Sequence, residues 1–388
     1  MAKSLVYFQS GGPTAVINCS LYGVIQESLK HAEIAEILGS KYGIEGLING
    51  DFIPLSGLSE ERMSLLKGMP GAALGSSRKK LSEDFADPLY QAILANVQKN
   101  NIGYILVNGG NDSMDTAEKL SRFFAEKHQD ISVIGVPKTI DNDLAFTDHA
   151  IGYPSAALHV IRSTAMIIDD AKAYKKGKIV LVEVMGRDTG WLTAATDLLP
   201  EGRRPDYIAV PEEKWNEDEF LNSIQSAYSR KGYAVAALSE GMPIAHVNDC
   251  GVDAFGHHPL EGACLALGHI IDERLKISNR TIELSIPSRS DPYSQSPIDV
   301  KEATSAGAFA VQSALKGETG KMVAIQRLSS KPYHSKLVLV PVKNVADATI
   351  YLPEAYLKDG QHFSEEFRAY LEPLLGKNIL YPDASFLK

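Results

Sequence analysis

The sequence contains little cysteine: its 388 residues include only Cys19, Cys250 and Cys264. The three are odd in number and widely spaced, and they form neither a CxxC pair nor a zinc-ligand pattern. The pattern is therefore not that of a disulfide-stabilised secreted domain or of a zinc protein. A reduced, cytoplasmic setting is the expectation that follows.

Long apolar runs are also missing. No segment reaches the ~20 residues that a membrane-spanning helix requires. The apolar stretch within residues 1–8 is too short for a signal peptide and predicts a first strand instead. We therefore expect a cytoplasmic protein with no membrane partner.

Positive charge is in deficit, because 39 lysines and arginines stand against 48 acidic residues and give a net charge of −9. A general nucleic-acid binder needs an excess of basic residues for phosphate contacts, so we expect no nucleic-acid partner. Short basic clusters at residues 78–80, 175–176 and 203–204 can still serve small anions. A solvated surface is the commoner role of such clusters.

Two common nucleotide-binding signatures are absent as well. The chain contains no GxxxxGK[ST] P-loop and no GxGxxG followed by a downstream acid. This absence argues against a P-loop nucleotide site, and also against a nicotinamide dehydrogenase on an α/β fold.

Strands and helices are predicted to alternate along most of the chain. Apolar runs bounded by turn residues predict buried strands, and the segments between them have helical periodicity. The predicted strands are residues 5–8, 35–38, 102–107, 131–136, 178–185, 208–211, 233–238, 281–286, 322–326 and 336–340. The predicted helices are residues 16–29, 87–98, 114–126, 151–172, 191–199, 217–230, 260–275, 299–315 and 363–375. This alternation predicts two parallel-sheet α/β domains, with a boundary near residue 150 and a return crossing after about residue 290.

Glycine-rich and polar segments follow several predicted strands, at the strand ends where parallel α/β sheets bind ligands. Gly11-Gly12 follows the first strand, and residues 108–113 (Asn-Gly-Gly-Asn-Asp-Ser) follow the strand at 102–107. A glycine turn before a helix suits a phosphate cradle, although two glycines are a weak signal and a plain tight turn is about as common. The small-residue loop at 71–78 ends in Arg78, whose guanidinium can reach a phosphate.

The segment from Pro137 to Asp143 concentrates the most chemistry. Lys138, Thr139, Asp141 and Asp143 follow the strand at 131–136 within six residues. A cation beside two acids suits a site that holds an anion and a metal and removes a proton. The alternative is a polar turn with an Asx cap. Three ligand-facing loops in one half of the chain favour the functional interpretation.

The motifs, in this order, resemble those of the 6-phosphofructokinase family, and most closely its pyrophosphate-dependent branch. The matching set is Gly11-Gly12, Gly109 to Ser113, Pro137 to Asp143, Met185-Gly186-Arg187, Glu240-Gly241, Arg280 and Arg289. The resemblance implies an α/β protein with two Rossmann-like parallel-sheet domains of the phosphofructokinase fold, and a site in the cleft between them. Residues 1–150 plus roughly 291–330 would form the donor domain, and 151–290 plus roughly 331–388 the sugar-phosphate domain.

The family's residue roles carry over to the matching positions. Asp141 would be the general base for the C1 hydroxyl of fructose 6-phosphate, with Thr139 beside it. Lys138, Arg187 and Mg²⁺ would neutralise the transferring group. The other proposed substrate contacts are Gly12 with the donor, Met185, Gly186 and Glu240 with the sugar, and Arg280 and Arg289 with the 6-phosphate. One of these arginines would reach across from a neighbouring subunit of a homodimer or homotetramer, and Asn111 with Asp143 would hold the metal.

The donor is expected to be pyrophosphate. Members of the family that use ATP carry GGDGS and PGTIDND, whereas this chain has Asp112 and Lys138 at two of those glycine positions. A carboxylate would repel a nucleotide's α-phosphate, and a lysine adds charge for the compact pyrophosphate; each such contact is worth roughly 1.5–3 kcal/mol. The implied reaction is reversible, Mg²⁺-dependent transfer from pyrophosphate to fructose 6-phosphate, giving fructose 1,6-bisphosphate and phosphate. The alternative functions are an ATP-dependent enzyme and a non-catalytic sugar-phosphate-sensing subunit. For Asp112 itself, the alternative is that it only caps the following helix.

Three residues depart from the family pattern. Asn111 stands where the family usually has a metal-binding aspartate, and an amide oxygen can bind Mg²⁺ without contributing charge. Ile286 replaces the usual histidine or tyrosine near the sugar phosphate. Lys178 replaces an arginine found in many ATP-using members, which keeps the charge but loses the bidentate geometry.

Overall fold

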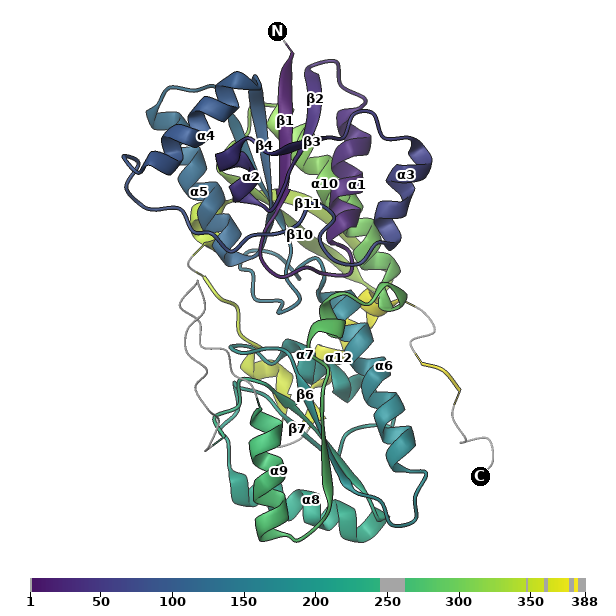
Figure 1. The fold of residues 1–388 in the computed structure, drawn as a ribbon. Helices are drawn as coiled ribbons and strands as arrows, with labels where there is room; N and C mark the ends of the chain where they lie inside the picture. The colour runs from purple at the N-terminus through teal and green to yellow at the C-terminus, as the bar shows by residue number, and fades with distance from the viewer. Residues whose placement is uncertain (1, 245–261, 347, 359–361, 377–379, 383–388) are drawn as a thin grey trace. The chain divides into compact units, whose positions relative to one another are not determined.

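The computed structural model describes residues 2–244, 262–346, 348–358, 362–376 and 380–382. Cys250 and the first two residues of the predicted helix 260–275 lie outside the described residues. The chain divides into two compact units, each built from two stretches of sequence (Figure 1). Unit 1 comprises Met1–Tyr153 and Arg289–Ile350, and unit 2 comprises Pro154–Ser288 and Tyr351–Lys388.

Unit 1 is built on a seven-stranded sheet in the order β11-β10-β5-β4-β1-β2-β3. Its strands are β1 (Lys3–Gln9), β2 (Ile34–Ser40), β3 (Phe52–Pro54), β4 (Ile102–Gly109), β5 (Ser132–Pro137), β10 (Lys321–Ser330) and β11 (Tyr333–Pro341). Its helices are α1 (Ile17–Ser28), α2 (Ile44–Asn49), α3 (Glu60–Leu65), α4 (Pro88–Lys99), α5 (Asn111–Glu126), α10 (Pro297–Leu315) and α11 (Val342–Val345). The five strands from β10 to β2 are parallel, whereas β3 and β11 pair antiparallel at the two edges. The predicted parallel sheet is therefore present, with one antiparallel strand added at each edge.

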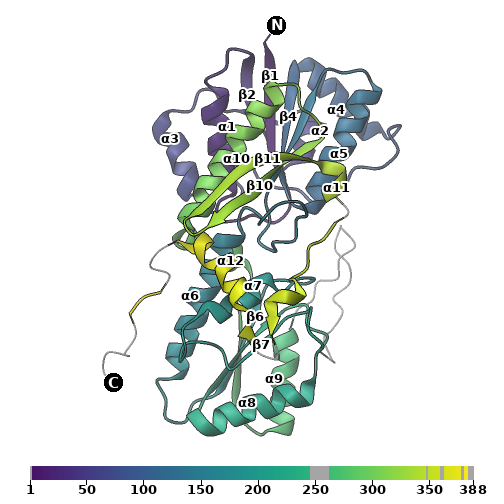
Figure 2. The same cartoon turned by 180° about the vertical axis from the view of Figure 1, so that it is seen from behind.

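Helices cover both faces of this sheet, which explains why its central strands are almost continuously apolar. In β5, Val133 belongs to the buried cluster that includes residues of α4 and α5, and Ile134 belongs to the one that includes residues of α1 and α10. These two pairs of helices cover opposite faces of the sheet (Figure 2). Successive side chains of a strand point to opposite faces, so both must be apolar when both faces are buried. The ligand-binding loops therefore start from a rigid and dry core.

Helices α1 and α10 lie side by side against the sheet (Figure 2). Glycine permits this close contact, because a methyl group on Gly23 would lie 2.0 Å from the Thr304 carbonyl oxygen. On α10, a methyl group on Gly307 would lie 2.1 Å from the carbonyl oxygen of Ser20. Both distances are far below a van der Waals contact, so the two backbones can approach only where neither residue has a side chain.

Unit 2 contains a four-stranded parallel sheet in the order β7-β8-β6-β9. Its strands are β6 (Ile179–Val184), β7 (Tyr207–Ala209), β8 (Ala234–Ser239), β9 (Asn279–Glu283), β12 (Leu357–Lys358) and β13 (His362–Phe363), the last two forming a separate small pair. Its helices are α6 (Tyr153–Ala171), α7 (Trp191–Ala194), α8 (Glu217–Lys231), α9 (Ala263–Arg274) and α12 (Glu365–Leu375). Helices α8 and α9 share a buried apolar cluster with alternate residues of β6 and β8. None of the described helices combines the length and apolarity needed to cross a membrane.

The carboxyl-terminal part of the chain differs from the predicted domain assignment. Residues 331–350, expected in the second domain, belong to unit 1. The reason is the hairpin between β10 and β11, which pairs Lys321 with Pro341 and Ser330 with Tyr333 and so keeps the second strand in the first sheet. The chain was predicted to cross back after about residue 290, and the second stretch of unit 1 starts at Arg289.

Candidate active site

The glycine turn after β1 has lysine and arginine side chains against it. Lys138 Nζ donates a hydrogen bond of 2.5 Å to the Gly12 carbonyl oxygen. A methyl group on Gly12 would approach Nη1 of Arg289 to 2.9 Å, and one on Gly11 would lie 3.4 Å from Lys138 Nζ. Gly11 also has a φ of +74°, a conformation that favours glycine. The structure thus brings the turn, Lys138 and Arg289 together within unit 1.

Lys138 follows β5 directly and is buried. Burial lowers its pKa to about 8, the nearby charges of Asp141 and Asp143 act to raise it, and those of Arg289 and Arg78 act to lower it further. An anion in this cluster would favour the charged ammonium. The protonated fraction of Lys138 would therefore rise when an anion binds beside it.

Asp141 lies in a tight turn that begins at Thr139. The Asp141 amide donates to Thr139 Oγ1 at 3.1 Å, and this hydroxyl lies 3.4 Å from Asp141 Oδ2. The Thr139 amide in turn donates to the Ile151 carbonyl oxygen at 3.1 Å, so the start of the loop is joined to its end. A carboxylate held in this way, with a buried ammonium in electrostatic range, can accept a proton.

Asn111 and Asp143, the two residues predicted to bind the metal, are in contact. Asn111 Nδ2 donates to Asp143 Oδ2 at 3.0 Å, and no described residue donates a hydrogen bond to the buried Asn111 Oδ1. An amide oxygen and a carboxylate are oxygen ligands of the kind Mg²⁺ takes. The described residues contain no cluster of three His, Cys, Asp or Glu side chains suited to a metal. The pair therefore fits an ion that takes most of its ligands from substrate phosphates and water.

Asp112 lies in the first turn of α5, and its carboxylate is 3.3 Å from Lys80 Nζ. The interpretation of Asp112 as a helix cap is not supported, because the cap residue is Gly110 and no side chain caps this helix. Sequence reasoning missed the role of Lys80. Its signal was the basic cluster at 78–80, for which a solvated surface was the commoner interpretation.

In unit 2, the loops after β6 and β8 carry the predicted sugar-binding residues. The Gly186 amide donates to Glu240 Oε1 at 3.3 Å, and the Glu240 amide donates to the Val184 carbonyl oxygen at 2.9 Å. A methyl group on Gly241 would lie 1.7 Å from the Arg187 carbonyl oxygen, so the loops touch through backbone. The Arg187 guanidinium binds Asp188 Oδ2 at 2.7 Å. Met185, Gly186, Arg187 and Glu240 are thus neighbours because β6 and β8 pair in parallel.

Arg280 does not join this group within the chain. It aligns with Val180, five residues before Met185, which at ~3.3 Å per residue separates it by about 16 Å from that end of the sheet. Arg280 is exposed on the edge strand β9. Of the departures, Ile286 is exposed in unit 2, and Lys178 immediately precedes β6.

The profile of the family described as Phosphofructokinase matches residues 4–314. This chain belongs to the phosphofructokinase family. A pyrophosphate–fructose 6-phosphate 1-phosphotransferase of Xanthomonas campestris is 36% identical to it over 386 residues, covering 96% of this chain and 91% of that protein. A sulfofructose kinase of Alkalicoccus urumqiensis is 31% identical and is covered to 92%, as is this chain. The crystal structure of a pyrophosphate-dependent phosphofructokinase from Marinobacter aquaeolei superposes with a TM-score of 0.87, at 33% identity, over 98% of this chain and 94% of that one.

Proposed function

We propose that this protein is a pyrophosphate-dependent 6-phosphofructokinase. It transfers a phosphoryl group reversibly from pyrophosphate to the C1 hydroxyl of fructose 6-phosphate, giving fructose 1,6-bisphosphate and phosphate. The observation that carries the proposal is the buried Lys138, whose ammonium lies on the Gly12 carbonyl oxygen. The relatives named above support it, because two of the three are named for pyrophosphate as donor.

The donor preference follows from two charges in unit 1. Lys138 occupies the space beside Gly11 and adds a cation to the glycine turn, where a compact diphosphate needs neutralisation. Asp112 adds a carboxylate at the start of α5, on the side of Lys80. A nucleotide would have to bring its α-phosphate past this carboxylate, so both residues favour pyrophosphate over ATP.

The chemistry is an in-line phosphoryl transfer, in which positioning and charge neutralisation supply most of the catalysis. Asp141 accepts the proton of the C1 hydroxyl as the hydroxyl oxygen attacks phosphorus. The bond between phosphorus and the bridging oxygen breaks, and phosphate leaves. Lys138 and Arg187 compensate the charge on the phosphoryl oxygens, and Thr139 holds the Asp141 turn.

Mg²⁺ would be held by Asn111 and Asp143 together with oxygens of the bound pyrophosphate. When bound, the ion would supply charge neutralisation to the phosphate oxygens. Asn111 contributes an oxygen without charge, so Asp143 would be the only charged protein ligand of this pair. The affinity for the metal would therefore depend strongly on pyrophosphate.

Unit 1 would bind the donor through Gly12 and Lys138, and unit 2 would bind the sugar through Met185, Gly186 and Glu240. Arg289 and Arg280 would clamp the 6-phosphate. Arg280 is about 16 Å from Met185 in its own sheet, so it would serve the site of a neighbouring subunit in a homodimer or homotetramer. The two described cysteines are free and buried, which agrees with a cytoplasmic setting.

A coupled assay on the purified chain tests the proposal. With Mg²⁺ and fructose 6-phosphate, pyrophosphate should support formation of fructose 1,6-bisphosphate, with a kcat/KM at least about 100-fold above that for ATP. Turnover would also exclude the sensing-subunit alternative, whereas turnover with ATP alone would overturn the choice of donor. A parallel assay with sulfofructose tests the acceptor, because one relative is named sulfofructose kinase.

A further inference from the structure

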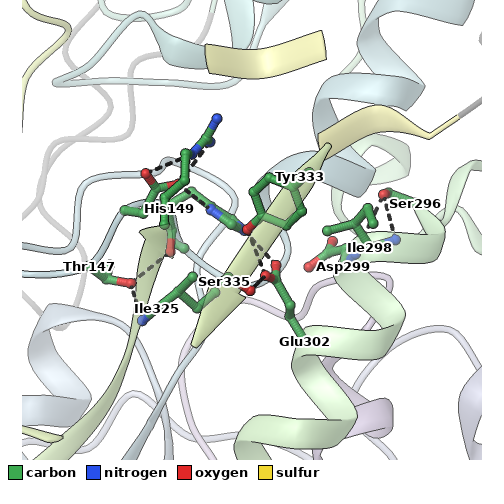
Figure 3. A network of polar contacts seen from close by, with 12 residues as sticks. Thr147, His149, Ser296, Ile298, Asp299, Glu302, Ile325, Tyr333 and Ser335 are labelled. Atoms are coloured by element: carbon green, nitrogen blue, oxygen red, sulfur yellow. Dashed lines mark hydrogen bonds and ion pairs between the residues drawn. The ribbon is translucent and has the colours of Figure 1, made fainter. Parts of the chain in front are cut away.

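His149 lies near the end of the loop that carries Asp141, and it is completely buried (Figure 3). Its Nδ1 is 2.9 Å from Asp148 Oδ2, and its Nε2 is 2.9 Å from Glu302 Oε2 on α10. Ionised carboxylates only accept hydrogen bonds, so both ring nitrogens must carry protons. His149 is therefore an imidazolium between two carboxylates.

The charged groups around His149 balance one another. Arg327 of β10 donates to Asp148 Oδ2 at 2.8 Å, so two cations face Asp148 and Glu302. Glu302 Oε1 accepts from the hydroxyls of Tyr333 at 2.7 Å and Ser335 at 2.6 Å on β11 (Figure 3). Each oxygen of Glu302 is thus hydrogen-bonded. Loss of the His149 charge would leave the buried Glu302 and the partly buried Asp148 with one arginine, which is unfavourable.

The same α10 helix contributes a second acidic residue to the loop end. Asp299 Oδ1 accepts a hydrogen bond of 2.9 Å from the Gly152 amide. Burial opposes the charge on His149, but the hydrogen bonds with Asp148 and Glu302 outweigh it and raise the pKa of His149 to about 9. The imidazolium therefore persists at neutral pH.

Two hydrogen bonds connect the residues that follow His149 to the part of the loop that holds the proposed general base. The Ala150 amide, next to His149, donates to Asn142 Oδ1 at 2.8 Å, and Asn142 follows Asp141 directly. On the other side of Asp141, the Thr139 amide donates to the Ile151 carbonyl oxygen at 3.1 Å. Thr139 and Asn142, which flank Asp141 on its two sides, are thus bonded to Ile151 and Ala150, the two residues that follow His149.

We propose that His149 is a positioning residue, whose imidazolium joins Asp148 to Glu302 and thereby holds residues 139–151 in the conformation that presents Asp141 to the acceptor hydroxyl. This inference rests on the proposed function, in which Asp141 is the general base. His149 itself does not touch the reacting atoms. It acts through the Ala150 and Ile151 backbone, which lies against the Asp141 turn.

His149→Gln tests this inference, because glutamine keeps one donor but cannot be an imidazolium that joins both carboxylates. A displacement of the base by about 1 Å can cost ~10²-fold in rate, so kcat should fall roughly 10–100-fold, while KM for both substrates stays within about threefold. Hydrogen exchange of a peptide covering 138–152 should accelerate by about tenfold or more. His31→Gln is the matched control, since it removes a histidine–carboxylate contact of 3.2 Å to Glu27 elsewhere in unit 1.

A purely structural role predicts a different result. If kcat and exchange of the 138–152 peptide match those of the His31→Gln control, or if kcat falls only as far as the folded fraction falls, the inference is overturned. Should His149→Gln not fold, Tyr333→Phe removes one hydrogen bond from Glu302 and should produce a smaller change in the same direction, with no change overturning the inference. If the unsubstituted chain shows no turnover, the proposed function fails, and peptide exchange alone then decides whether His149 orders the loop.

Discussion

The Asp141 amide donates to the hydroxyl of Thr139, and the Asp141 carboxylate lies in the electric field of a buried lysine. These contacts place an acceptor-only side chain in a fixed turn directly after a rigid strand. Lys138 raises the local positive potential at Asp141, while the hydrogen bond described for its ammonium goes to the Gly12 carbonyl oxygen. In the proposed reaction, Asp141 would act on the hydroxyl and Lys138 on the phosphoryl group.

Replacing Asp141 with serine should lower kcat by ~10²–10⁴-fold, because a general base usually contributes that much, with little change in KM for fructose 6-phosphate. Steady-state kinetics with pyrophosphate at saturation measures this. Asp170→Ser, at an exposed position on α6, is the control and should behave like the unsubstituted chain. A near-normal kcat for the Asp141 variant would remove this residue from the mechanism.

The double substitution Asp112→Gly and Lys138→Gly tests the donor argument. Removing the cation on the Gly12 carbonyl should raise KM for pyrophosphate, and removing the carboxylate paired with Lys80 should allow ATP to act as donor. The measurement is kcat/KM for both donors at fixed fructose 6-phosphate. Unchanged pyrophosphate kinetics in the double variant would contradict the assigned roles.

The loop between β5 and α6 contains no helix and no strand of the main sheet, but contacts within it and with its neighbours fix its conformation. Its two ends are joined by the bridge between Thr139 and Gly152, and a second bridge pairs Leu144 with Thr349. Helix α10 supplies Glu302 to the buried ion cluster, and Ser296 caps this helix by accepting from the Ile298 amide at 3.2 Å. This loop is therefore held by contacts with a helix more than 140 residues away in the sequence.

The His149 cluster should also make stability depend on pH. Its pKa is raised to about 9, from 6.5 in the unfolded chain, so its contribution is complete below pH 6.5 and is lost as the pH rises through about 9. The melting temperature should therefore fall more between pH 8 and pH 10 for the unsubstituted chain than for His149→Gln. Differential scanning calorimetry in matched buffers measures the difference, and parallel curves for the two proteins would contradict it.

On the scale of the whole molecule, the chain separates into two units, and the crossing points at Tyr153 and Arg289 lie next to functional segments. Most of the residues proposed for the donor and the metal fall in unit 1: Gly12, Asn111, Asp112, Lys138 and Asp143, together with the proposed base Asp141 and the proposed 6-phosphate ligand Arg289. The loops after β6 and β8, with Arg187 and Glu240, fall in unit 2. The proposed donor residues are thus mostly in unit 1 and the proposed sugar residues mostly in unit 2, whereas the sugar phosphate would also need Arg289 of unit 1.

Binding of magnesium pyrophosphate should stabilise the folded chain. At 100 times its dissociation constant a ligand adds ~2.7 kcal/mol, and at roughly 2–4 °C per kcal/mol the melting temperature should rise by about 5 °C or more. EDTA should abolish most of this rise if Asn111 and Asp143 hold the metal with the pyrophosphate. Asn111→Ala should reduce the metal-dependent part of the rise in melting temperature. Asn100→Ala is the control, because Asn100 precedes β4 whereas Asn111 follows it, and it should leave the rise unchanged. An equal rise with and without EDTA would contradict the metal site.

Much of the fold was predictable from the sequence, because strands buried on both faces must be apolar without interruption. Central strands such as β4 and β5 are examples, and the prediction of an α/β family fold is confirmed by the match to solved structures. The short elements β3, α2 and α11 were missed, since three to six residues carry too little periodicity. The place of β11 was also missed, because an apolar strand has the same pattern in either sheet, and the direction of the chain after β10 depends on the hairpin.

The sequence by itself determined which side chains are available at the strand ends: the glycine turn, Lys138, the two loop aspartates and the segment Met185 to Arg187. Local spacing is enough for this, because residues that follow parallel strands lie at one edge of a sheet. Only the tertiary structure decided that Lys138 bonds to Gly12, that Lys80 pairs with Asp112, and that Glu302 meets His149. These contacts join residues 32 to 153 positions apart, and the physical reason is that the packing of helices and strands brings these charged and polar groups together, which sequence spacing does not encode.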